Sequence, residues 1–131
     1  MDEETKQQFR KFAELYGLVK DDFQQLHKMF IIKRRGIEKI MRGMEAEVSF
    51  EVVPEFTDIS SDKYCIKCCA RKKDSTYLVT TYGESSPENT KVKYPIAICE
   101  KRAMARAILK LANLYELPVH AEEEINPHDN E

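Results

Sequence analysis

Three basic side chains recur at every fourth position in an alanine-rich segment near the end of the chain. They are Arg102, Arg106 and Lys110, and this spacing places them along one ridge of a helix. Like charges at this spacing repel each other, whereas a phosphate backbone supplies repeated anions that relieve the repulsion. Residues 91–110 contain six basic residues and one acidic residue. The ridge therefore predicts a helix that binds a nucleic-acid backbone.

A second basic segment lies in the first third of the chain. It begins with Lys33-Arg34-Arg35, and residues 33–42 carry five basic residues against one acidic residue. Two such segments in a chain with a formal net charge of −2 favour a binding groove. The alternative is that each is an ordinary solvated face. The predicted nucleic-acid-binding residues are Lys33, Arg34, Arg35, Lys91, Lys93, Lys101, Arg102, Arg106 and Lys110.

Exposed aromatic side chains could add base stacking to these charges. Tyr77, Tyr82 and Tyr94 are the candidates, although aromatic residues in strands more often serve packing.

The sequence carries no arrangement of residues typical of catalysis. The three histidines accompany no nucleophile or carboxylate motif, and no glycine-rich phosphate loop occurs. We therefore expect no enzyme activity and no cofactor. Cys65, Cys68 and Cys69 are spaced like metal ligands, but strand alternation points Cys65 and Cys68 to opposite faces. We expect reduced thiols and no metal site.

Periodicity predicts the elements that must position the basic residues. Helices are expected at residues 3–16, 21–27, 36–42 and 96–115, and strands at 47–52, 63–71 and 76–82, with 29–32 a strand or buried turn. The predicted fold is α+β, with a three-stranded antiparallel β-meander, a packed C-terminal helix and an N-terminal helical lead. Ile98, Ala105, Ile108 and Ala112 form the inward stripe of the last helix, which leaves the basic ridge exposed.

The charge distribution suggests one domain followed by a tail. Residues 1–120 are expected to form a single domain, and residues 121–131 carry five acids and no Lys or Arg. Such a tail either is disordered or shields a basic surface. There is no apolar run long enough to span a bilayer and no signal-peptide pattern, so we expect a cytoplasmic protein without a membrane partner.

Two segments resemble one known family. The run from Phe30 to Ile40 ahead of a strand, and the run from Tyr94 to Ala107, are similar to the Erf-like single-strand annealing proteins of phages and mobile elements. Those proteins are related to the eukaryotic Rad-type annealing protein. The resemblance covers roughly residues 17–124 and implies a β-β-β-α core, a homo-oligomeric ring or filament, and single-stranded DNA in a basic groove. It also implies that Lys101-Arg102-Ala103 touches the DNA backbone. The family's next basic residue falls where this chain has Ala105, which leaves the role of Arg106 open.

We therefore expect a single-stranded DNA-binding, annealing recombination accessory. One alternative is a module like the double-stranded RNA-binding domain, which clamps phosphates with lysines at the start of its last helix. Another is a protein-interaction or inhibitor module that acts through the acidic tail.

Overall fold

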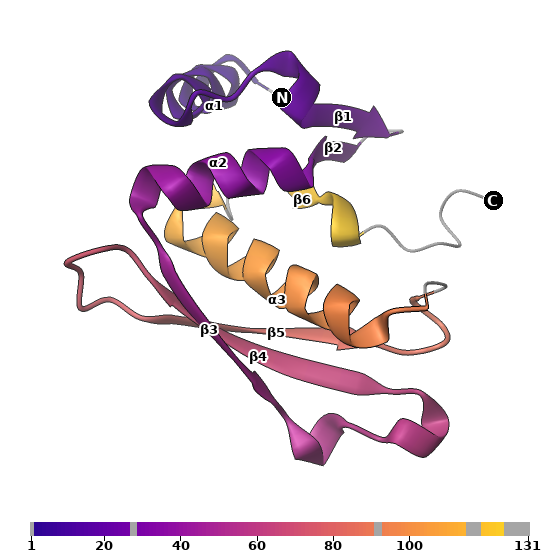
Figure 1. Ribbon diagram of the computed structural model, residues 1–131. Helices are drawn as coiled ribbons and strands as arrows, with labels where there is room; N and C mark the ends of the chain where they lie inside the picture. Colours follow the sequence, from indigo (N-terminus) through magenta and orange to yellow (C-terminus); the bar gives the residue numbers. More distant parts are fainter. Residues whose placement is uncertain (1, 27–28, 91–92, 115–118, 125–131) are drawn as a thin grey trace.

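The chain folds into a lower sheet covered by a long helix, with a smaller layer of helices and short strands above that helix (Figure 1). The computed structural model describes residues 2–26, 29–90, 93–114 and 119–124. The helices are α1 (Glu3–Tyr16), α2 (Arg34–Met44) and α3 (Pro95–Leu111). The strands are β1 (Phe23–Leu26), β2 (Met29–Ile32), β3 (Glu47–Val52), β4 (Tyr64–Arg71), β5 (Val79–Ser85) and β6 (Val119–Ala121). Short 3-10 turns are η1 (Lys20–Asp22), η2 (Pro54–Phe56), η3 (Ile59–Ser61) and η5 (Glu122–Glu124).

The lower sheet is the predicted antiparallel meander, in the order β3-β4-β5. Its register pairs Phe50 with Cys68, and Cys68 with Thr81. Because side chains alternate along a strand, Cys68 and Thr81 face α3, and both are buried. The α+β prediction, with three antiparallel strands and a packed C-terminal helix, is confirmed.

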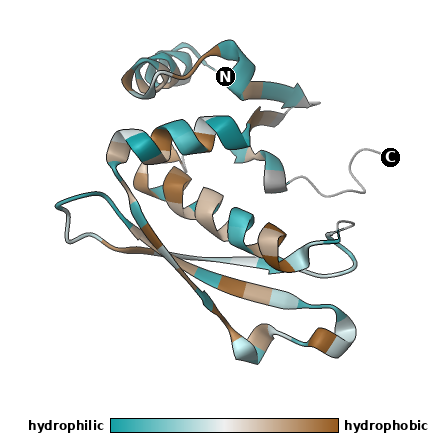
Figure 2. Cartoon of the chain, viewed as in Figure 1, coloured by the Kyte–Doolittle hydropathy of each residue, from teal (hydrophilic) through white to brown (hydrophobic). Residues whose placement is uncertain are grey.

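Helix α3 lies between the two layers and is buried on two sides. It carries mostly hydrophobic residues along its length (Figure 2). Cys99 and Ala103 lie against the sheet, where the Thr81 hydroxyl donates to the Ala103 carbonyl over 2.6 Å. Ala105 and Ile108 belong to the predicted inward stripe and are buried in the core. Small side chains on the sheet face let α3 approach the strands closely.

The upper layer contains α1, α2 and a second small sheet, in the order β1-β2-β6. Strand β6 runs parallel to β2, with Val119 opposite Phe30 and Ala121 opposite Ile32. Helix α2 packs on α3 and fully buries Ile37 and Ile40 in the common core. The helical N-terminal lead was predicted, but the second sheet was not.

The predicted helix at residues 21–27 is wrong, because a 3-10 turn and β1 occupy this segment. Asp22 does not cap a helix that continues along the chain. Its carboxylate is buried and accepts hydrogen bonds from Arg35, Lys39 and the Val19 amide. The next residue, Phe23, packs on Phe30 of the neighbouring strand. Burial of this pair stabilises the hairpin in preference to a helix.

Two predicted boundaries also shift. The third strand of the meander runs from Val79 to Ser85 instead of from residue 76 to 82. Gly83 and Ser85, expected in a loop, lie under α3 and are buried, so the strand continues through them. Residues 121–124, expected in the acidic tail, belong to β6 and η5. Residues 125–131 lie outside the described part of the chain.

Candidate nucleic-acid-binding surface

Arg102, the first residue of the predicted ridge, is not available to a ligand. Its exposed fraction is 6 %. Nη1 donates to the Glu84 carbonyl over 2.8 Å and to Asn89 Oδ1 and Thr90 Oγ1 over 3.1 Å each, and Nη2 donates to the Asn89 carbonyl over 2.8 Å. The prediction that Arg102 lies on an exposed face is wrong. Through these hydrogen bonds the guanidinium instead holds the loop after β5 against α3.

Arg106 lies one turn further along the same side of α3 and is already paired with carboxylates. Nε and Nη2 donate to the two carboxylate oxygens of Glu124 over 2.6 and 2.8 Å, and Nη2 also reaches Glu84 over 3.2 Å. Partial burial alone would lower the pKa of Arg106, but the hydrogen bonds that it donates to Glu124 and Glu84 raise its pKa overall. Arg106 is therefore a charged, well-oriented anion-binding group whose present anions come from this chain.

Both arginines also bind the free edge of the sheet. The Tyr82 carbonyl accepts from Arg106 Nη1 over 2.5 Å, and the Glu84 carbonyl accepts from Arg102. These carbonyls are two residues apart on β5, the last strand of the sheet. A sheet edge whose carbonyls are occupied is a poor template for pairing with another chain.

At the start of α2, Arg35 has a structural role. Its Nε donates to the buried Asp22 over 2.9 Å, and Lys39 Nζ donates to the same carboxylate over 2.7 Å. Burial alone would raise the pKa of Asp22, but the hydrogen bonds from Lys39, Val19 and Arg35 lower it overall. Arg35 and Lys39 neutralise the buried carboxylate of Asp22. Arg35 therefore stabilises the fold, and we no longer expect it to contact a ligand.

Arg34 faces the C-terminal segment. Its backbone amide donates to Glu122 Oε1 over 3.0 Å, and its Nε lies 3.4 Å from Glu38. Lys33, immediately before α2, is half-buried and supplies no side-chain hydrogen bond that caps the helix. The three-residue turn η5 thus contacts both basic segments, through Glu122 at Arg34 and through Glu124 at Arg106.

The N-terminal half of α3 carries the exposed part of the predicted site. Lys93 and Lys101 are exposed, and the exposed fraction of Tyr94 is 73 %. Lys101 and Ile108 are seven residues apart in α3 and therefore share one side of the helix. Ile108 is covered by the upper layer, whereas the N-terminal half of α3 extends beyond the start of α2 (Figure 1). Lys110, at the other end of α3, is exposed, and Lys91 lies outside the described residues.

We define the α2–α3 surface as Lys33, Arg34, Lys101, Arg106 and Tyr94. Within this surface, Arg34 and Arg106 are both contacted by η5. The other predicted stacking residues, Tyr77 before β5 and Tyr82 on β5, are exposed, and neither belongs to this set, although the Tyr82 carbonyl accepts from Arg106.

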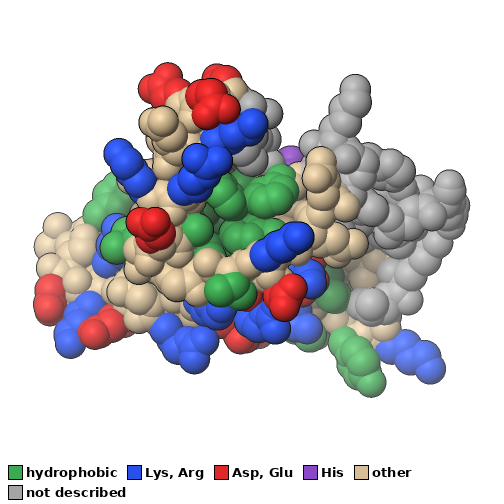
Figure 3. Space-filling model, turned by 90° about the horizontal axis from the view of Figure 1, so that it is seen from above, with side chains coloured by type: hydrophobic (Ala, Val, Ile, Leu, Met, Phe, Trp, Pro, Cys, Tyr) green, Lys and Arg blue, Asp and Glu red, His purple; other side chains and the backbone are tan. Residues whose placement is uncertain are grey.

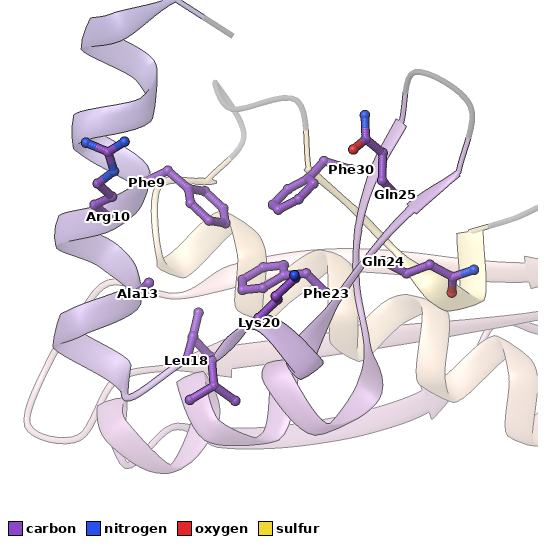
Figure 4. Close-up of a pocket in the computed structure, with 10 residues that line it drawn as sticks. Phe9, Arg10, Ala13, Leu18, Lys20, Phe23, Gln24, Gln25 and Phe30 are labelled. Carbon is purple, nitrogen blue, oxygen red and sulfur yellow. The ribbon is translucent and has the colours of Figure 1, made fainter.

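A second surface feature is an aromatic pocket that the sequence reasoning missed. Phe9 of α1 and Phe23 and Phe30 of the small sheet have ring centroids 5.0 Å apart in each pair. They line a pocket of about 340 Å³ between α1 and β1, with Arg10 and Lys20 among its lining residues (Figure 4). Seen from above, hydrophobic side chains gather at the centre of the upper layer (Figure 3). The signal in the sequence is the aromatic content of residues 9–30, which the sequence analysis did not use.

The four cysteines are free thiols, and Cys65, Cys68 and Cys99 are buried. Cys68 is fully buried beneath α3, and burial raises its pKa to about 11. Burial also raises the pKa values of Cys65 and Cys99. Within the described residues, no three His, Cys, Asp or Glu side chains are grouped closely enough to hold a metal ion. In the same part of the chain, no helix has the length and apolar character needed to cross a membrane.

Comparison with known proteins finds no match: no family model, no curated protein and no solved structure is similar to this chain.

Proposed function

We propose that this protein is a cytoplasmic, non-enzymatic accessory of DNA recombination that binds single-stranded DNA on the α2–α3 surface and promotes annealing. The observation that carries the proposal is the position of η5. This three-residue turn contacts Arg34, the first residue of α2, and Arg106 in α3, so one cationic residue from each basic segment lies next to the same turn. If the two basic segments were unrelated solvated faces, one acidic turn would not need to contact both of them.

The surface offers two kinds of contact that suit a single strand. Lys101 and the amide end of α2 are donors for phosphate oxygens. Tyr94, exposed beside Lys93, offers an aromatic face on which an unpaired base can stack. A paired duplex hides the faces of its bases, so the aromatic contact favours a single strand over a duplex.

The first test is a binding comparison among single-stranded DNA, double-stranded DNA and double-stranded RNA at several salt concentrations. We expect single-stranded DNA to bind best. If about four phosphates are neutralised, the logarithm of the affinity should fall with the logarithm of salt at a slope of about −2.8. Lys101→Ala should weaken binding and reduce that slope by about 0.7, because one phosphate contact is lost.

Lys72→Ala is the matched control, because Lys72 is exposed next to the β4–β5 turn and does not belong to the α2–α3 surface. Both variants should unfold within about 0.5 kcal/mol of the parent, as ordinary surface changes do. Equal binding by the Lys101 and Lys72 variants would contradict the site, and tight binding to duplex RNA alone would favour the alternative RNA-binding reading.

We also propose that the protein assembles into homo-oligomers above the dimer. Helix α3 packs mainly on β4 and β5. It leaves Phe50 and Val52 exposed on the same face of the edge strand β3, and the exposed fraction of Val52 is 54 %. An uncovered apolar strand at an open edge is a surface that a second copy can cover.

Light scattering with and without DNA tests this assembly. Val52→Lys should reduce the mass of the assembly, whereas Leu78→Lys, which charges an exposed apolar residue elsewhere, should leave it unchanged. A strict monomer under both conditions contradicts assembly and with it the annealing role, but leaves simple DNA binding intact.

A further inference from the structure

We infer that the carboxylates of Glu122 and Glu124 hold positions that two phosphates of the bound strand take, so that η5 competes with DNA for the α2–α3 surface. This inference rests on the proposed function. It adds two specific positions for phosphates and a competing segment within the protein, and it is based on the hydrogen bonds that Glu122 and Glu124 accept.

The first position is the guanidinium of Arg106. Glu124 accepts two roughly parallel hydrogen bonds from Nε and Nη2, over 2.6 and 2.8 Å. The same fork binds two oxygens of a phosphate with similar geometry. The exposed fraction of the Arg106 side chain is only 28 %, so this cation is costly to leave without an anion. A phosphate that replaces Glu124 keeps the charge of Arg106 compensated.

The second position is the amino end of α2. The Lys33 side chain caps nothing there, the first turn contains no acid, and the Arg34 amide donates to Glu122 instead. By contrast, α1 supplies its own cap from Asp2 and has Glu3 and Glu4 in its first turn. Helix α2 thus takes its anion from a segment 88 positions away, at the end of a helix where free amides and the helix dipole favour a phosphate.

The turn η5 can move away from the α2–α3 surface without unfolding the domain. Strand β6 is held by backbone pairing with β2 up to Ala121, whose side chain is buried. Glu122 is exposed, and Glu124 contacts the surface through the Arg106 pair. Rotation of the backbone just after Ala121 therefore removes both carboxylates while β6 stays in the sheet.

The test compares the full chain with the double variant Glu122→Gln/Glu124→Gln. Glutamine keeps an acceptor oxygen but removes the charge, so contacts within the protein weaken without a change of shape. We expect the affinity for a thymidine oligonucleotide at low salt to rise roughly tenfold, because two competing anions are neutralised. The matched control is Glu14→Gln/Glu55→Gln, which makes the same change in net charge at exposed residues of α1 and η2. This control should change the affinity by no more than about twofold, through long-range charge alone.

The single variant Glu122→Gln keeps the Arg106 pair and so guards against misfolding of the double variant. It should show an intermediate gain. Hydrogen exchange gives an independent readout, because amides of residues 122–124 should exchange faster when the wild-type protein binds the oligonucleotide. If the wild type binds DNA but the Glu122 and Glu124 variants bind no better than the control, the competition is refuted and the proposed function stands. If no variant binds DNA at any salt concentration, the proposed function fails and the competition fails with it.

Discussion

Replacing Gly83 by alanine should strongly lower the free energy of unfolding of the protein. Gly83 lies on β5 directly beneath α3, and a Cβ atom there would overlap the Cys99 carbonyl oxygen and lie 2.7 Å from the Ala103 nitrogen. Both are backbone atoms of α3, so no change of rotamer can relieve the overlap. The helix would have to lift from the sheet that it covers. We expect a cost above about 4 kcal/mol, a large part of the 5–15 kcal/mol by which domains of this kind are stable.

Urea unfolding followed by circular dichroism measures this effect. Gly17→Ala is the control, because Gly17 has a φ of 66° but no atom within 4 Å of an added Cβ. That change should cost about 1 kcal/mol, from backbone strain alone. A Gly83→Ala protein that unfolds at nearly the parent's urea midpoint would show that α3 is not pressed against β5 as the structure has it.

Arg102→Ala should have the next largest effect, a loss of about 3–4 kcal/mol of stability. The change removes a buried cation and leaves the Glu84 and Asn89 carbonyls without their donor. Hydrogen bonds to charged groups contribute about 1.5–3 kcal/mol each, and buried acceptors left unpaired add a further penalty. Because the loop after β5 leads into α3, its release should also loosen the start of that helix.

Thermal melts of three variants separate this role from DNA binding. Arg102→Lys should recover only a small part of the loss, because an ammonium cannot reproduce the fork that reaches Glu84 and Asn89 together. Lys101→Ala, at the exposed neighbouring position, should melt close to the parent. If Arg102→Ala unfolds at the same temperature as the parent, Arg102 does not stabilise the fold and is again expected to contact the ligand.

The orientation of the basic ridge shows where sequence reasoning succeeded and where it failed. Helical spacing correctly placed Arg102 and Arg106 on one side of α3, and the stripe through Ala105 and Ile108 is indeed buried. The error came from assuming one buried side. Ala103 lies on a second buried side, toward the sheet, and alanine at such positions looks the same in sequence as a solvated helix former. With two sides covered, the arginines lie along β5 instead of in solvent.

The short strands were beyond the reach of local patterns. The meander was predictable because Val48, Phe50 and the residues of β4 alternate over enough positions to reveal a period of two. Strands β1 and β6 have four and three residues, which is too short for a period to emerge. The pairing of Arg106 with Glu124 was also hidden from local patterns, because β6, which precedes Glu124, is positioned by its pairing with β2.

That parallel pairing has a consequence for the chain during its synthesis. Phe30 pairs with Val119, which is made 89 positions later (119 less 30). At ribosomal rates of about 5–20 residues per second, β6 is synthesised several seconds after β2, which until then pairs only with β1. During this interval one edge of β2 can accept a strand from another nascent chain. A β6 exchanged in this way would carry its η5 turn onto the neighbouring molecule, so that each chain would complete the small sheet of the other.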